Sequence, residues 1–95
     1  MKRYELTKEQ WERIKELLPP ERAGKRGRPR KDNRTMLNGI LWIVRNGAQW
    51  RELPETYGPW QSVYARFAKW RDDGTLEAIF RALSADADME NLSLD

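Results

Sequence analysis

The feature that most constrains the fold of this chain is a run of seven residues, 25–31, that holds five cations, one glycine and one proline. The run has no large apolar side chain that could be buried. Gly27 and Pro29 both oppose helix formation, and Pro29 also restricts Arg28 to an extended conformation. The run therefore predicts an extended basic segment that separates a helical part before it from a second helical part after it.

A narrow, extended and cationic segment fits the minor groove of A·T-rich DNA, where the negative potential is strong. The order Arg-Gly-Arg-Pro at residues 26–29 is similar to the core of an AT-hook. We call residues 21–33 the basic arm; the candidate DNA contacts in and beside it are Lys25, Arg26, Arg28, Arg30, Lys31 and Arg34. Two alternatives for the same residues are a solvated linker and a nuclear-localisation signal.

Positive charge is concentrated in this part of the chain. Residues 21–34 hold seven basic and two acidic residues, an excess of five positive charges, whereas the whole chain of 95 residues has a net charge of +3. Charge focused in this way favours a polyanionic partner such as double-stranded DNA. The chain has no cysteine and no histidine, which excludes disulfides and removes the usual acid–base group at neutral pH. We expect no cofactor in this chain.

No run approaches the roughly 20 apolar residues of a membrane span, and no signal peptide is visible. We therefore expect a cytoplasmic protein without a membrane partner. Apolar residues recur at helical spacing in four stretches, which predicts an all-α fold: a small bundle of about four helices with the basic arm between helices one and two. Alternating leucines in residues 91–95 indicate a short C-terminal strand.

The first predicted helix follows a capping box of Thr7 and Gln10 and ends at the two prolines 19 and 20. Its predicted core side chains are Trp11, Ile14, Leu17 and Leu18. The second helix is expected from about residue 34 to residue 46, with Asp32 or Asn33 as its cap and Gly47 at its end.

Gly39, in the middle of that second helix, costs about 1 kcal/mol relative to alanine, so we expect another helix to approach it closely, with simple tolerance as the alternative. A short helix is predicted over residues 49–53 and a third helix from residue 60 to about residue 72, with Pro59 at its first position. Thr75 is the predicted cap of a fourth helix.

The third predicted helix has two distinct faces. One is an apolar stripe formed by Trp60, Val63, Tyr64, Phe67 and Trp70. The other is polar and offers Gln61, Ser62, Arg66 and Lys69 as candidate DNA contacts. Helices that read the major groove are built in this way, since glutamine can pair with adenine, arginine with guanine and serine with either. Residues 34–72 are therefore expected to form a helix-turn-helix-like core; an ordinary amphipathic helix is the alternative.

The five tryptophans, at positions 11, 42, 50, 60 and 70, raise the alternative of stacking on single-stranded bases. Their helical spacing favours a place in the core instead.

Several motifs together resemble the N-terminal DNA-binding domain of bacterial insertion-sequence transposases. They lie at residues 4–11, 17–20, 27–32, 37–41, 58–64 and 67–70, and most clearly at residues 47–54, Gly-Ala-Gln-Trp-Arg-Glu-Leu-Pro. The resemblance implies a helical domain, residues 1–90, that recognises the terminal inverted repeats of the element. It also implies that residues 91–95 begin an RNase H-like catalytic domain that is truncated here.

The same resemblance implies that Asp95 is the first acid of a DDE triad that binds Mg²⁺ in the full-length transposase. Two-metal phosphoryl transfer needs several carboxylates around cations about 4 Å apart, so a chain with an incomplete triad is expected to be catalytically silent. Two further interpretations stay open. One is an oligomerisation or inhibitory module of transposition, in which the chain pairs with itself. The other is an enzyme fragment completed by a downstream transposase polypeptide.

Overall fold

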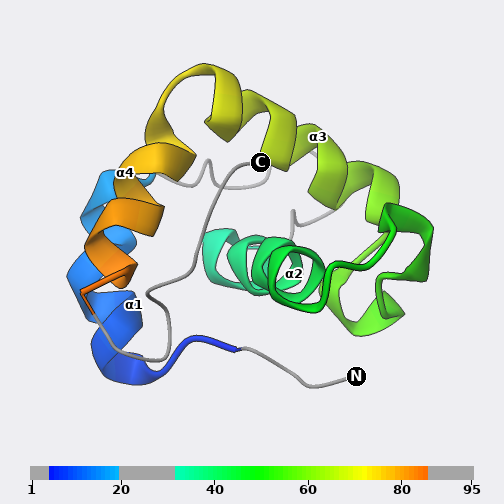
Figure 1. Ribbon diagram of the computed structural model, residues 1–95, viewed down its shortest axis with the longest axis horizontal. Coiled ribbons are helices and arrows are strands. Elements are labelled where there is room, and N and C mark those ends of the chain that lie inside the picture. The colour runs from blue at the N-terminus through cyan, green and yellow to red at the C-terminus, as the bar shows by residue number, and fades with distance from the viewer. Residues whose placement is uncertain (1–4, 20–31, 86–95) are drawn as a thin grey trace, which may run out of the picture.

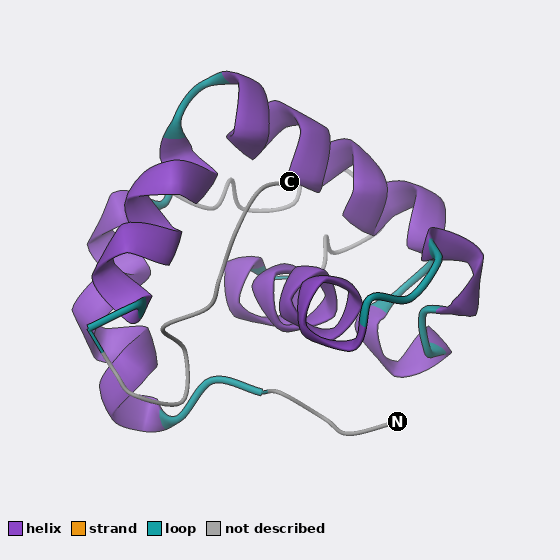
Figure 2. Cartoon of the chain, in the orientation of Figure 1, coloured by secondary structure: helices purple, strands orange, loops and turns teal. Residues whose placement is uncertain are grey.

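The computed structural model describes residues 5–19 and 32–85 of the chain. These residues contain four α-helices and three short 3₁₀ helices and no strand, which confirms the all-α class (Figure 2). The arm cations Lys25, Arg26, Arg28, Arg30 and Lys31, the strand predicted over residues 91–95, and Asp95 lie outside the described residues.

Helix α1 (Lys8–Ile14) begins with the predicted capping box. The Gln10 amide N–H donates to Thr7 Oγ1 at 3.1 Å, and the Thr7 amide N–H donates to Gln10 Oε1 at 2.9 Å. The chain then tightens into the 3₁₀ helix η1 (Lys15–Leu17), which turns Leu17 out to solvent and leaves Leu18 buried. The prediction that Leu17 belongs to the core is therefore wrong, because the helical period shortens just before it.

Helix α2 (Asn33–Asn46) lies at the centre of the fold, with the other α-helices around it (Figure 1). Asp32 is its cap, since Asp32 Oδ1 accepts from the Thr35 amide at 2.7 Å. The helix ends at Gly47, whose φ of 64° is the left-handed conformation expected after a helix. The predicted end at Gly47 is confirmed, and of the two caps that the sequence offers the structure uses Asp32, so that the helix begins at Asn33.

The close approach predicted at Gly39 is confirmed. A Cβ atom added there would lie 3.1 Å from Tyr57 Cβ and 3.2 Å from Val63 Cγ1. Tyr57 belongs to the 3₁₀ helix η3 (Glu55–Tyr57), and Val63 belongs to α3 (Trp60–Asp72). Glycine at position 39 thus allows two neighbouring elements to pack directly on the backbone of α2.

The remaining α-helices lie where the sequence predicts them, with differences in their caps and one additional 3₁₀ helix. Helix η2 (Trp50–Glu52) is the short helix expected near residues 49–53, whereas η3 had no counterpart in the prediction. Helix α4 (Thr75–Leu83) begins at Thr75, but its cap is Gly74, and Asp73 Oδ1 accepts the Thr75 amide N–H at 2.9 Å. The assignment of Thr75 as the cap is therefore wrong, because the aspartate two residues earlier takes the free amide.

The core is formed mainly by α2, α3 and α4, and its fully buried side chains include Leu37, Ile40, Trp70, Leu76 and Ile79. The segment before α1 is held against α2, since the Leu6 amide donates to Asn38 Oδ1 at 2.8 Å. None of the helices in residues 5–19 and 32–85 has the length and hydropathy needed to span a bilayer.

Candidate nucleic-acid interface

Helix α3 is held by one side and presents a polar face on the other. Val63 and Trp70 are completely buried and anchor the helix to the core. Gln61, Ser62 and Lys69 are exposed. The Ser62 and Val63 amides donate to the Pro59 carbonyl at 3.0 and 3.2 Å, so Pro59 is the cap of this helix and Trp60 is its first residue. The prediction that Pro59 takes the first helical position is therefore wrong by one residue.

The three exposed polar side chains differ in the chemistry they offer. Gln61 has both a donor and an acceptor, Ser62 has a hydroxyl, and Lys69 has a positive charge. Gln61 and Ser62 lie in the first turn of α3 and Lys69 lies about two turns further along the same side, so a ligand that runs along α3 could contact all three. Side chains of these kinds contact base edges and phosphates in protein–DNA complexes.

Arg66 lies at the edge of this face and has partners within the domain. Its Nη1 donates to Asn33 Oδ1 at 3.0 Å, and its guanidinium carbon lies 5.6 Å from the centre of the Trp70 ring. The side-chain nitrogen of Asn33, Nδ2, in turn donates to the Pro19 carbonyl at 2.9 Å. Arg66 therefore joins α3 to the first residue of α2, and its contact with a base stays a prediction.

Arg34 also has an intramolecular role. Its Nη2 donates to the Leu6 carbonyl at 3.3 Å, and its guanidinium carbon lies 6.0 Å from the centre of the Trp11 ring. The structure therefore does not bring Arg34 into the group formed by Gln61, Ser62 and Lys69, since its side chain fastens α2 to the segment before α1. A DNA contact of Arg34 stays a prediction too.

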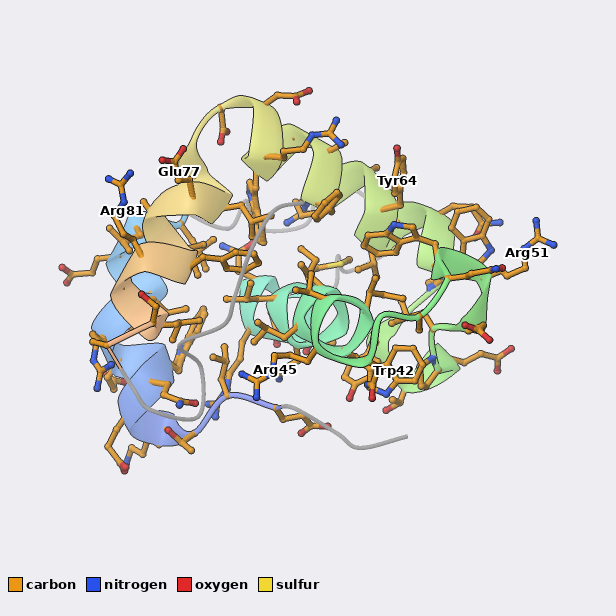
Figure 3. The ribbon with its side chains drawn as sticks, in the orientation of Figure 1. Trp42, Arg45, Arg51, Tyr64, Glu77 and Arg81 are labelled. Carbon is orange, nitrogen blue, oxygen red and sulfur yellow. The ribbon has the colours of Figure 1, made fainter. Side chains whose placement is uncertain are left out.

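A cluster of aromatic side chains flanks the polar face. The rings of Trp50 and Tyr64 meet edge to face with centres 5.3 Å apart, and Trp50 and Phe67 lie 5.2 Å apart. Tyr64 is 41% exposed and points away from the body of the molecule (Figure 3). Trp60 is 36% exposed, so its predicted place in the core is wrong; it is the first residue of α3.

One titratable group beside this face has a shifted pKa. The Thr75 hydroxyl and amide bind the Asp73 carboxylate and hold its pKa below the usual range, and the positive charge of Lys69 acts in the same direction. Across the described ranges, 5–19 and 32–85, no three acidic, histidine or cysteine side chains gather in a group that could hold a metal ion.

Asn33 is the residue of this site that sequence reasoning missed, since it appeared there only as one of two possible helix caps. Its side chain is buried and contacts both Pro19 and Arg66. An asparagine at the start of a helix is so common that the sequence gives no signal for this role.

The fold and this face together define a small helical domain with a solvent-facing polar helix. Residues 6–80 match the family described as "Putative transposase of IS4/5 family", so the chain belongs to that family. This finding confirms the resemblance to the N-terminal domain of insertion-sequence transposases.

Two curated proteins are similar to this chain, and the name of the second refers to an insertion element. The uncharacterized protein y4sN of Sinorhizobium fredii is 41% identical over 90 residues, which cover 95% of this chain and 71% of that protein. The insertion element IS402 uncharacterized 16.2 kDa protein of Burkholderia cepacia is 32% identical over 82 residues, which cover 81% of this chain and 56% of that protein. No solved structure matches the chain.

Proposed function

We propose that this chain is the part of an insertion-sequence transposase that binds duplex DNA and recognises the terminal inverted repeats of its element. The observation that carries the proposal is the exposed polar face of α3, with Gln61, Ser62 and Lys69 on a helix anchored by buried side chains. A helix presented in this way fits the major groove, which is about 12 Å wide. The proposal is also supported by the chain's membership of a family described as a putative transposase, because transposases act on DNA.

Each side chain has a role in this proposal. Gln61 and Ser62, in the first turn of α3, pair with base edges, and Lys69 neutralises a phosphate. The cations of the basic arm, Lys25, Arg26, Arg28, Arg30 and Lys31, bind the minor groove or its phosphates. The domain would span residues 1–90 and act in the bacterial cytoplasm. Asp95 and Mg²⁺ would contribute only within a complete catalytic domain.

The first experiment separates base reading from general affinity. A duplex selected from a random pool is compared with an unrelated duplex by fluorescence anisotropy. Gln61→Ala should weaken binding to the selected duplex by about 1–3 kcal/mol and binding to the unrelated duplex much less. Glu9→Ala, an exposed position on α1, is the control. Unchanged binding of Gln61→Ala to both duplexes would remove α3 from the interface.

A salt titration tests the arm separately. Because each neutralised phosphate releases counterions, replacing Arg28 and Arg30 with alanine should reduce the slope of log affinity against log salt by roughly 2. A slope equal to that of the wild-type chain would mean that the arm does not touch DNA.

A second candidate function is supported by the exposed aromatic side chains Trp60 and Tyr64, which are the kind of residue that is enriched in protein interfaces. In this alternative the chain is an oligomerisation or inhibitory module of transposition. Light scattering on a sizing column distinguishes the two functions: a stable dimer without DNA, disrupted by Tyr64→Ser, supports the alternative, and a monomer that binds DNA excludes it.

A further inference from the structure

Helix α3 exposes a flank on each side of the buried stripe that anchors it. An exposed residue directly precedes and another directly follows each of the two buried anchors: Ser62 and Tyr64 around Val63, and Lys69 and Arg71 around Trp70. With 3.6 residues in each helical turn, the two neighbours of an anchor project to opposite sides of it. Ser62 and Lys69 therefore share one flank, and Tyr64 and Arg71 share the other.

The proposed function uses only the first of these flanks. An α-helix with its side chains is about 10–12 Å across, and the major groove is about 12 Å wide. A helix that lies in the groove therefore has a phosphate backbone beside each flank. Residues 58–71 contain no acidic residue, so the charge of both flanks suits a polyanion along this stretch.

Arg71 is held at the surface by two contacts. Its guanidinium carbon lies 5.5 Å from the centre of the Phe67 ring, and that ring lies 5.2 Å from the ring of Trp50 in η2. Its Nε donates to Asp72 Oδ1 at 3.1 Å. This hydrogen bond uses one of the five N–H donors of the guanidinium, and the side chain is 42% exposed. The donors on Nη1 and Nη2 have the planar geometry that binds phosphate oxygens in pairs.

Tyr64 adds a second polar group to the same flank. Its ring meets the ring of Trp50 edge to face with centres 5.3 Å apart, and 41% of the residue is exposed. Asp72 and, to a smaller extent, Tyr64 raise the pKa of Arg71, so the guanidinium keeps its charge. Tyrosine hydroxyls donate to phosphate oxygens in protein–DNA complexes. The flank thus combines a fixed cation with a neutral donor.

From this arrangement we propose that Arg71 and Tyr64 bind the phosphate backbone that borders the groove on the side of α3 opposite to Lys69. The inference rests on the proposed function and adds a second backbone contact to it. Arg71 is already held by its neighbours without DNA, so it loses less side-chain freedom on binding than a mobile cation does. Contacts to both backbones fix the rotation of α3 about its axis, and with it the direction of Gln61 toward the bases.

Arg71→Ala removes the charged contact. Binding to the selected and the unrelated duplex is measured by fluorescence anisotropy over a series of salt concentrations. A phosphate contact carries no sequence information, so affinity should fall at least about threefold on both duplexes, and the slope of log affinity against log salt should fall by about 0.9. Arg71→Lys keeps the charge without the planar fork, so it should restore the slope and only part of the affinity.

Two further variants make the test specific. Arg81→Ala is the matched control, because Arg81 also pairs with an acid, Glu77, at 2.7 Å, but lies on α4, far from Tyr64 (Figure 3). It should leave the slope unchanged. Tyr64→Phe keeps the ring and loses only the hydroxyl, so it should weaken binding to both duplexes roughly twofold or more at an unchanged slope. Thermal melts followed by circular dichroism establish that each variant is folded.

The outcomes separate this inference from the proposed function. Equal effects of Arg71→Ala and Arg81→Ala on affinity and slope would overturn the contact of Arg71, and a selective loss in Gln61→Ala would show that DNA binding stands. A loss confined to the selected duplex would also overturn it, since Arg71 would then contact a base. Unchanged binding by folded Tyr64→Phe would remove Tyr64 from the contact. If the wild-type chain binds neither duplex, the proposed function fails and this inference fails with it.

Discussion

Gly39 offers a direct test of how the core is packed. In an exposed helix, replacing glycine with alanine gains about 1 kcal/mol of stability from helix propensity. At position 39 the new Cβ would lie 3.1 Å from Tyr57 Cβ and 3.2 Å from Val63 Cγ1, closer than carbon atoms normally pack. Overpacking of a core costs typically 1–3 kcal/mol. We therefore expect Gly39→Ala to lower the free energy of unfolding by about 0–2 kcal/mol.

Urea denaturation followed by tryptophan fluorescence and by circular dichroism measures this change. Ala65→Gly, at an exposed position in the middle of α3, calibrates the propensity term and should cost about 1 kcal/mol. Gly39→Val adds two further carbons to the same gap and a β-branched side chain to a helix, so it should cost more than Gly39→Ala. A gain of about 1 kcal/mol for Gly39→Ala would refute the close packing described here.

Two further predictions concern stability. Leu18→Ala should cost about 2–5 kcal/mol and Leu17→Ala less than about 0.5 kcal/mol in the same urea assay, because only Leu18 is buried; equal losses would contradict the turn at η1. Since Thr75 lowers the pKa of Asp73 in the folded state, the stabilisation from Asp73 is present above its unfolded-state pKa and lost as the pH falls through its folded-state pKa. Asp73→Asn should flatten the acid side of the stability curve, and an NMR titration that places the Asp73 pKa at its ordinary value would exclude the effect.

Local signals in the sequence were sufficient to place most helices. The capping box at Thr7, the cap at Asp32 and the left-handed glycine at position 47 each depend on a few neighbouring residues, so a short stretch of sequence carries the information. The close approach at Gly39 was also predictable, because an unfavourable residue in a helix needs a packing reason. These features explain why the all-α class followed from the sequence alone.

The errors arose where tertiary contacts decide between similar local choices. Leu17 and Leu18 are adjacent and identical, and only the tightening of the chain at η1 determines which one is buried. Trp60 belongs to the apolar stripe by spacing, but its position in the first turn of α3 leaves it partly exposed. Helical periodicity predicts which face of a helix a side chain lies on. It does not predict whether a neighbouring element covers that side chain and buries it.

Arg34 and Arg66 show that the charge of a residue does not by itself identify a DNA contact. By their charge, Arg34 and Arg66 were both candidates for DNA contact, yet each donates a hydrogen bond within the domain and lies near a tryptophan ring. Guanidinium suits this role because it is weakly hydrated, planar and able to donate in several directions at once. Replacing either arginine therefore disturbs the fold as well as any DNA contact, whereas Gln61 offers a side chain whose loss changes the surface alone. A loss of DNA affinity in an arginine variant identifies a contact only if the melting temperature is unchanged.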